Sequence, residues 1–329
     1  MSMVPRFLGE LEYAGKVITE SLDKITSQFS YSDPDGGESD TFSITLADTE
    51  KKWAGPWYPK KGDRIDVALL LLFWNGTISP PRKMVCGSFT LDKVGLHGGK
   101  TATLAGVSKP AKTDFTTTDR TKTWTGVTLE EVAQDVAGQA GLTLHYDAGN
   151  IPLAKEEQSG PDADFLKSLC ERYGLRMKVY RDKLVIFDRA AYKKKPPAMT
   201  FGPANRELGE DWDYDDNLER YTGVELTYTN ADGEEIKYTH GDDERMLFIN
   251  QKADNDTDAE RIALAALEKE NHGCTTISFT TRAQPGLCAS QTIRIAGTQT
   301  KADGTYYVDN VDTAGSDSGL VMNVKGSKI

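Results

Sequence analysis

The residues that come nearest to a catalytic pattern are four carboxylates in one short run, Asp211, Asp213, Asp215 and Asp216. Most glycosidases use a pair of carboxylates as acid and base, so this run could supply such a pair. The spacing also suits an exposed strand, because every second side chain of a strand points to the same face. We favour the strand, since alternating carboxylates need no partner when they face solvent.

A second acidic run imitates the start of a calcium-binding loop, with carboxylates at Asp254, Asp256, Asp258 and Glu260. Such a loop needs a glycine at its sixth position and a bidentate glutamate at its twelfth. The sequence has Ala259 and Ala265 there instead. Carboxylates are also favourable in the first turn of a helix, so we predict a helix that opens with a capping box at Thr257–Glu260.

Histidine and cysteine, the common nucleophiles and metal ligands, are few and scattered: His97, His145, His240, His272, Cys86, Cys170, Cys274 and Cys288. No C-x-x-C pair occurs, and the neighbours His272 and Cys274 lack the second pair that a zinc site needs. The G-x-S-x-G, H-E-x-x-H and phosphate-loop motifs are also absent from the sequence. We therefore predict no enzymatic activity, no metal and no cofactor, and thiols buried in a reducing compartment.

The charge distribution argues against nucleic-acid binding. The 329 residues carry a net charge of −11. Residues 205–270 hold 20 acidic and 7 basic side chains, a balance of −13, and such a surface repels phosphates. One basic and aromatic cluster exists, Trp53, Trp57 and Tyr58 among lysines, but the interleaved Pro56 and Pro59 favour a packed loop over a platform for stacked bases.

Neither export by a signal peptide nor membrane insertion is expected. Residues 1–9 contain no apolar run of the kind a signal peptide has. The longest apolar run, Ala68 to Trp74, is far shorter than the roughly 20 residues of a membrane helix. It is typical of a buried strand.

The elements that must position these side chains are β-rich at both ends of the chain. Residues 1–110 alternate with the period of strands and predict an all-β barrel or sandwich. Residues 22–31 and 41–46 flank a turn at 33–37 and predict a long hairpin. Further strands are expected at 64–73, 84–94 and 101–107.

The middle of the chain, 120–192, predicts a small α+β domain after a linker at 108–123. A capping box at Thr128–Glu131 opens one helix and Gly141 ends it. A second helix starts near Asp162 and ends at Gly174. Strands follow at 141–146, 174–180 and 184–187, so the domain is an imperfect helix–strand repeat, and a linker at 193–197 closes it.

The last segment, 198–329, predicts a second β barrel with one helix. Residues 224–229 and 234–239 flank Ala231-Asp232-Gly233 as a hairpin. Strands are expected at 275–281, 291–295, 305–311 and 320–324. The expected fold class is thus mainly β with an α+β insert.

An ordered series of short motifs resembles the phage late control protein D and VgrG-type hub family, found at the baseplate of contractile tails. In the first segment the series comprises Phe29–Asp33, Gly37–Asp40, Ile44–Asp48, Trp53, Trp57, Pro59, Gly62-Asp63, Cys86–Phe89 and Asp92. The series continues in the middle of the chain with Trp124–Gly126, Leu129, Glu157–Ser159, Asp164–Leu166 and Tyr173–Leu175. In the last segment the series comprises Ala263, Leu267, Pro285–Leu287, Ile293–Gly297 and Asp303–Tyr306. The motif order spans nearly the whole chain.

The resemblance implies two tail-tube-like barrels in one chain, flanking a small domain that is similar to LysM. Three chains would then form a pseudo-sixfold ring between the sixfold tail tube and the threefold spike. The implied partners are two further copies, the tail tube protein and the central spike protein, with the tape-measure protein and the baseplate wedge as further candidates. VgrG members continue into a needle, whereas this chain ends at Ile329, so the spike is expected to be another chain. Assembly in the bacterial cytoplasm and residence in a virion tail or tail-like particle follow from this role.

Two sets of residues are expected to serve such an assembly. We predict that the hairpin turn reaches a neighbouring chain, because a free two-stranded ribbon has unpaired edges; its interface residues would be Asp33, Asp35, Gly36, Gly37, Glu38 and Asp40. We predict that part of the acidic segment lines an axial channel, through Asp211, Asp213, Asp215 and Asp216. Negative walls would let DNA or a tape-measure protein slide without sticking.

Two alternatives stay open. The carboxylates of 211–216 could make the chain a peptidoglycan hydrolase of the tail tip. The middle domain could instead bind peptidoglycan. The sequence does not distinguish a complete phage, a tailocin and another contractile injector.

Overall fold

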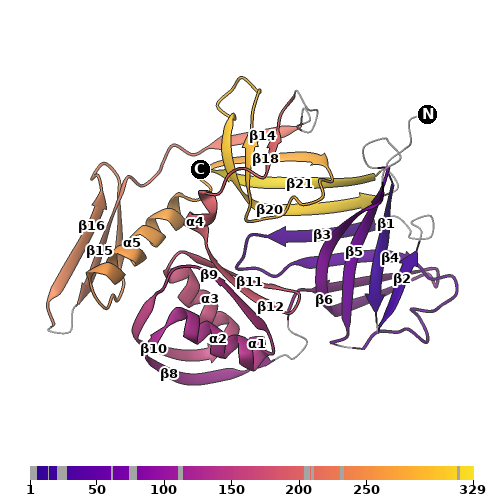
Figure 1. The fold of residues 1–329 in the computed structure, drawn as a ribbon, viewed down its shortest axis with the longest axis horizontal. Helices are drawn as coiled ribbons and strands as arrows, with labels where there is room; N and C mark the ends of the chain where they lie inside the picture. The colour runs from indigo at the N-terminus through magenta and orange to yellow at the C-terminus, as the bar shows by residue number, and fades with distance from the viewer. Residues whose placement is uncertain are drawn as a thin grey trace.

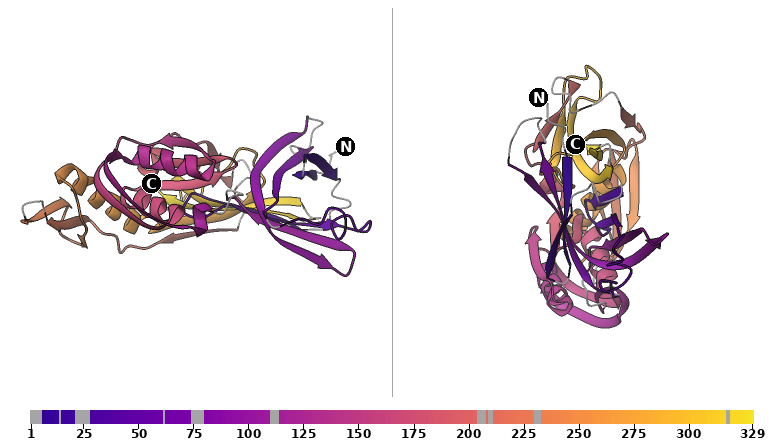
Figure 2. Two further views of the ribbon diagram at one scale, coloured as in Figure 1. Left: turned by 90° about the horizontal axis from the view of Figure 1, so that it is seen from below. Right: turned by 90° about the vertical axis from the view of Figure 1, so that its right-hand side faces the viewer.

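The computed structural model describes residues 6–13, 15–20, 28–60, 62–73, 80–109, 114–203, 208, 211–229, 233–316 and 319–329. Strands dominate it, with five helices among these residues (Figure 1). None of the described helices has the length and apolarity needed to cross a membrane. The N-terminal strands and the helical part of the chain lie at different ends of the molecule (Figure 2).

The strands of the first segment are β1 (Arg6–Tyr13), β2 (Lys16–Glu20), β3 (Gln28–Pro34), β4 (Thr41–Ala47), β5 (Arg64–Leu72), β6 (Arg82–His97) and β7 (Thr101–Val107). The middle contains α1 (Asp114–Thr117), β8 (Asp119–Thr128), α2 (Leu129–Ala140), β9 (Thr143–Asp147), β10 (Pro152–Pro161), α3 (Asp162–Arg172), β11 (Leu175–Tyr180), β12 (Lys183–Asp188) and α4 (Arg189–Lys193). The last segment contains β13 (Met199–Phe201), β14 (Trp212–Asp216), β15 (Gly223–Thr229), β16 (Glu235–Gly241), β17 (Met246–Asn250), α5 (Asp256–Asn271), β18 (Thr275–Arg282), β19 (Thr292–Ile295), β20 (Gly304–Ser316) and β21 (Gly319–Lys328).

One sheet runs through both ends of the chain, in the order β14-β18-β21-β20-β3-β4-β7-β6-β5-β1-β2, with β19 and β13 attached beside β20. The ladder from Asn310↔Pro34 to Gly315↔Phe29 joins the two β-rich segments. In Figure 1 the yellow C-terminal strands β20 and β21 therefore continue into the indigo and purple N-terminal strands. The predicted fold class, mainly β with an α+β insert, is confirmed, and the structure adds that its two β-rich ends share a sheet.

The expectation of a free hairpin ribbon is wrong. β3 and β4 do pair with each other, but the outer edge of β3 is taken by β20 and that of β4 by β7. Their buried positions alternate with more exposed ones, as the sequence pattern required. The hairpin is an internal part of the sheet, so it offers no unpaired edge to a neighbouring chain.

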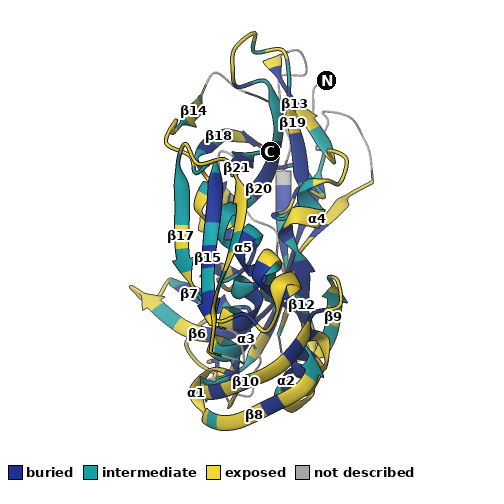
Figure 3. Cartoon of the chain, turned by 90° about the vertical axis from the view of Figure 1, so that its left-hand side faces the viewer, coloured by how far each residue is buried: buried dark blue, intermediate teal, exposed yellow. Residues whose placement is uncertain are grey.

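Apolar side chains form two cores. Figure 3 marks the buried residues along the chain in dark blue. The first combines the N-terminal strands with residues of 201–208 and 277–324, including Phe89, Phe201 and Tyr306. The second combines residues 115–186 with residues 224–263, including Leu129, Leu169 and Ile262. Each core thus draws on segments far apart in the sequence. The boundaries predicted at 110, 120, 192 and 198 stay predictions about separately folding units.

Local signals placed the middle helices well. Thr128 caps α2 in a complete capping box with Glu131, and Gly141 ends the helix in the left-handed conformation at φ 70°. The linker expected at 108–123 is wrong, since α1 and the start of β8 lie there. β8 pairs with β10, and β9, β11 and β12 form a separate three-stranded sheet. The likeness of this domain to LysM stays a prediction.

The capping box expected at Thr257–Glu260 is also wrong. α5 begins at Asp256, and its cap is Asn255, whose side chain accepts a hydrogen bond from the Asp258 amide at 3.0 Å. Asp258 in turn accepts from the Asp254 amide at 2.9 Å. The start of the helix therefore lies two residues earlier than the sequence predicted. The strands β15, β16 and β17 pack beside α5 as a small sheet of their own.

Candidate functional site

The carboxylates of β14 divide between the two faces of the sheet edge. Asp213 and Asp215 are exposed, whereas Trp212 and Tyr214 alternate with them and pack against the first core. Asp216 lies on the inward side, where it accepts a hydrogen bond from Thr275 at 2.6 Å and pairs with Arg220 at 2.7 Å. These hydrogen bonds, that from Thr275 first, lower the pKa of Asp216 below its usual value. Asp216 therefore does not share a face with Asp213 and Asp215.

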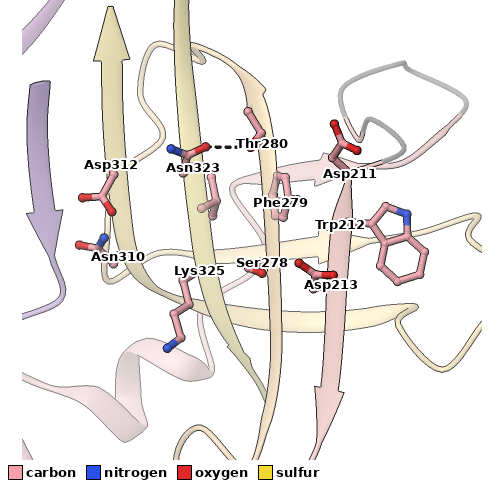
Figure 4. Close-up of a pocket in the computed structure, with 11 residues that line it drawn as sticks. Asp211, Trp212, Asp213, Ser278, Phe279, Thr280, Asn310, Asp312, Asn323 and Lys325 are labelled. Carbon is pink, nitrogen blue, oxygen red and sulfur yellow. Dashed lines mark hydrogen bonds between the residues drawn. The ribbon is translucent and has the colours of Figure 1, made fainter. Parts of the chain in front are cut away.

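An open cavity of about 540 Å³ lies on the exposed face of β14, β18, β20 and β21 (Figure 4). Ladder positions bring its side chains together: Asp213 lies opposite Ser278, and Ser278 lies opposite Lys325. Thr280 donates a hydrogen bond to Asn323 at 2.7 Å. Carboxylates, hydroxyls, amides and one ammonium group thus line the face: Asp211, Asp213, Ser278, Thr280, Asn310, Asp312, Asn323 and Lys325.

The polar face continues across the β20–β3 junction into the N-terminal half. Asp312 lies opposite Ser32, and Ser32 lies opposite Thr41. Two ladder positions further on, Ser30 faces Ser43. The hydroxyl groups of Thr45 on β4 and Thr103 on β7 are 2.9 Å apart. Because directly paired residues share a face of a sheet, this hydroxyl-rich surface is continuous from β14 to β7. We call it the polar sheet face.

The residues expected to contact a neighbouring chain lie in a buried ionic cluster instead. Asp33, Asp35 and Asp40 are 5%, 5% and 0% exposed, whereas Glu38 is exposed. Lys178 of β11 pairs with Asp33, and its ammonium lies 2.8 Å from Asp40. The structure thus gives these three aspartates partners within their own chain. Their contact with a neighbouring chain stays a prediction.

Arg176 holds the turn from the same strand. Its guanidinium donates two hydrogen bonds to Asp35, each of 3.0 Å. The amide of Gly37 donates to the Met177 carbonyl at 2.9 Å. A side chain on Gly36 would place its Cβ 3.1 Å from the Cβ of Arg176, at a φ of 146° that favours glycine. The turn and β11 therefore fit against each other at backbone distance.

A second group of charges extends the cluster to α4, α5 and β20. Glu268 of α5 pairs with Arg189 and with Lys193, each at 2.6 Å. His272 lies 2.7 Å from Asp309 of β20. We call this whole set the ionic junction, since it joins the β sheet to both parts of the second core: Asp33, Asp35, Asp40, Arg176, Lys178, Arg189, Lys193, Glu268, His272 and Asp309.

Burial and charge compete in the ionic junction. Burial raises the pKa of Asp40 to about 7, although the Lys178 ammonium opposes it. Burial would also raise the pKa of Glu268, but Arg189 and Lys193 lower it below its usual value. For Lys178, burial lowers the pKa, yet the nearby Asp33 and Asp40 raise it above its usual value. The lysine is therefore charged at neutral pH.

Among the described residues, Asp35, His272 and Asp309 bring ligand atoms close enough to suggest a metal ion. Their neighbours argue against one. Asp35 already accepts two hydrogen bonds from Arg176 and lies 4.0 Å from Arg189, so cationic groups occupy the approach that a metal would take. We therefore interpret the three residues as part of the ionic junction.

The cysteines do not form a reactive site. Cys86 and Cys170 are buried, as the sequence predicted, and burial raises the pKa of each thiol above its usual value. Cys288 is exposed and Cys274 is half-buried, so the expectation of buried thiols is wrong for these two. Although the Cys288 residue is exposed overall, the protein atoms packed around its thiol desolvate it and raise its pKa to about 11. A thiol with a raised pKa is a poor nucleophile at neutral pH.

No protein-family model matches the sequence, and no curated protein matches it. Solved structures do. A tail protein from Neisseria meningitidis MC58 superposes with a TM-score of 0.72 at 15% identity, covering 98% of this chain and 96% of that one. A 43 kDa tail protein of prophage MuSo2 from Shewanella oneidensis gives 0.69 at 13% identity, covering 98% of both chains.

A third similar structure is that of a secretion-system component. The E. coli c3393 protein, described as a type VI secretion component with similarity to the T4 tail proteins gp27 and gp5, gives a TM-score of 0.57 at 10% identity. The match covers 97% of this chain and 76% of that one. The hub resemblance of the sequence is thereby supported at the level of structure: this chain has the fold of phage tail proteins and of a tail-like component of type VI secretion.

Proposed function

We propose that this chain is a structural hub of a contractile phage tail or phage-tail-like particle. Three copies would form a pseudo-sixfold ring that joins the tail tube to the central spike, with tape-measure and wedge proteins as further partners. The tail-protein fold over the full chain supports this assignment. The observation that carries it is the polar sheet face, which spans both β-rich segments without a break.

A surface of this kind suits the wall of an axial channel. Its side chains are mainly hydroxyls, amides and scattered charges, which stay hydrated, and its apolar members are few: Trp212, Phe279, Val321 and Val324. Within the acidic run, we propose that Asp211, Asp213 and Asp215 face the channel. Asp216 is left out of this proposal, because it points inward and is already paired with Arg220. Like charges would repel DNA or an acidic protein segment.

Cysteine accessibility in assembled particles tests this proposal. Cys274 and Cys288 are first replaced by serine, since neither is fully buried. Asp213→Cys is then compared with Glu130→Cys, a control at an exposed position of α2. In particles, Asp213→Cys should react with a small maleimide but not with a polymer-linked one, whereas Glu130→Cys should react with both. Equal reaction of both positions with the large reagent would show that the polar sheet face is not in a channel.

The same proposal implies that the chain does not hydrolyse peptidoglycan. The carboxylates nearest to a catalytic pair, Asp211 and Asp213, lie on an open sheet face beside Lys325 rather than in an enclosed cleft. Purified protein should release no soluble muropeptides from isolated cell walls. Release that disappears in the Asp213→Asn variant would contradict the proposal and restore the hydrolase alternative.

A further inference from the structure

The small sheet β16-β15-β17 has an unpaired edge. β17 pairs in parallel with β15, and the described residues place no strand on its other side. The carbonyl of Arg245 accepts a hydrogen bond from the Thr222 amide, in the segment that leads into β15, so the backbone groups of Arg245 point toward β15. The backbone groups of successive residues in a strand point alternately to its two edges. The amide and carbonyl groups of Met246, Phe248 and Asn250 therefore point to the free edge. Such an edge can pair with another chain.

A groove lies beside this free edge. It has a volume of about 410 Å³ and runs between β17 and the helices α3 and α5. Its lining combines four apolar side chains, Leu247, Ile249, Ile262 and Ala266, with polar and charged ones: Ser168, Glu171, Arg172, Gln251, Lys269 and Glu270. On the other face of β17, Phe248 is 70% exposed. A strand added to β17 would lie over the groove, with alternate side chains directed into it.

Charge defines the kind of strand that fits. The turn that leads into β17 carries three exposed carboxylates in a row, Asp242, Asp243 and Glu244. Glu225 lies next to Phe248 across the β15–β17 ladder but already pairs with Lys237 at 3.0 Å, so the exposed carboxylates of the turn are the ones open to a partner. β1, the first described strand, lies on the far side of the molecule from β15 and β16 (Figure 1).

We propose that β17 is a docking site for an extended segment of another protein in which basic and apolar residues alternate. The segment adds as a strand to the free edge of β17. Its apolar side chains enter the groove between α3 and α5, and its basic side chains face the carboxylates of 242–244. This surface is separate from the polar sheet face, so the assignment holds whether or not that face lines a channel.

A synthetic peptide of alternating lysine and valine is the probe, and a peptide of alternating glutamate and valine is its control. We expect saturable binding of the lysine peptide to the full chain, with slower hydrogen exchange in 245–251, and no binding of the glutamate peptide. Asp243→Lys with Glu244→Lys should weaken binding about tenfold or more, because it reverses the charge at the rim. Binding of both peptides alike, or of neither, would overturn the proposal.

Two further variants distinguish backbone pairing at the β17 edge from non-specific binding to exposed apolar side chains. Phe248→Pro removes one outward amide of β17 without removing a bond to β15, so it should abolish peptide binding while the circular dichroism stays unchanged. Tyr58→Ser, which removes another exposed aromatic side chain far along the chain, should leave binding unchanged. Equal loss in both variants would overturn strand addition. Protection of 245–251 by self-association of the free protein would show that the occupant is a second copy.

Discussion

At the scale of single residues, two carboxylates share one buried lysine. Asp33 and Asp40 both pair with Lys178, and the side chains of all three are nearly buried. The two carboxylates repel each other unless the ammonium lies between them. Removing a charge from this group or adding a proton to it therefore changes the stability of the whole junction.

The Asp40 carboxyl makes stability depend on pH. Its pKa is raised from 3.8 to about 7, so the folded chain binds this proton more tightly than the unfolded chain does. The contribution of Asp40 is fully present below its unfolded pKa of 3.8 and is lost as the pH rises to about 7. The protein should be more stable near pH ~5.5 than near pH ~8 through this group.

Urea unfolding of wild type and Asp40→Asn at both pH values isolates this effect. The asparagine variant cannot titrate, so its stability should change less between the two conditions than that of wild type. Other groups that titrate in this range act on both proteins and cancel in the difference. The same pH dependence in both proteins would show that Asp40 ionises as it does in water.

Lys178 itself should be far more sensitive than an exposed lysine. Lys178→Met leaves Asp33 and Asp40 without their cation, and breaking a buried ion pair in this way costs about 3–5 kcal/mol. Lys325→Met, on the polar sheet face, should change stability by about 0.5 kcal/mol or less. Urea midpoints at a pH near ~8 measure both. A Lys178 variant that unfolds at the wild-type midpoint would mean that water enters the junction and replaces the ammonium.

At the scale of elements, α5 shows how two overlapping start signals are resolved. Asn255 and Thr257 can each cap a helix, and the structure uses Asn255. Asn255→Ala should cost about 1 kcal/mol, the usual effect of removing a cap, whereas Thr257→Ala lies inside the helix and should cost less. Thermal unfolding of the two variants compares them directly. A larger loss for Thr257→Ala would contradict the cap assignment.

The elements that the sequence predicted well are those with local signals. The capping box at Thr128, the stop at Gly141 and the hairpin of β15 and β16 each depend on residues within a few positions of one another. The sequence did not predict β8, because its residues are nearly all polar and show no alternation of apolar and polar side chains. Trp124 is its buried residue. The acidic run at 254–258 also has a long-range explanation: Asp254 accepts from the Ala154 amide at 2.9 Å, and Asp256 accepts from the Tyr228 hydroxyl at 2.6 Å.

The candidate sites follow the same division. Period-2 alternation correctly placed Asp213 and Asp215 on the exposed face of a strand. The partners of Asp33 and Asp35 could not be found in this way, because Lys178 and Arg176 are more than 140 residues away. An acidic turn and a basic strand are each unremarkable alone. Their pairing can be recognised only from the three-dimensional structure, in which β11 packs against the turn.

At the scale of the whole molecule, neither core is made by one continuous segment. The turn that follows α3 comes so close to α5 that a Cβ on Gly174 would lie 3.2 Å from the Cβ of Ala265. Leu169 and Cys170 of α3 and Ile262 and Ala263 of α5 belong to the same buried cluster. The core of the middle segment is therefore completed by residues of 224–263, which come after that segment in the sequence.

This interdependence predicts how fragments behave. A fragment of residues 114–197 keeps α1 to α4 and their strands but loses α5 and the sheet β16-β15-β17, which cover one side of its core. Burial of apolar surface is the main stabilising term, so the fragment should bind a hydrophobic dye and exchange its amide protons much faster than the full chain. Adding residues 217–274 as a separate peptide should restore protection, because it supplies the missing Val224, Leu226 and Ile262. An unrelated acidic peptide of the same length should not. A fragment that alone is protected like the full chain would instead make 114–197 an autonomous domain, with α5 and its sheet merely resting on its surface.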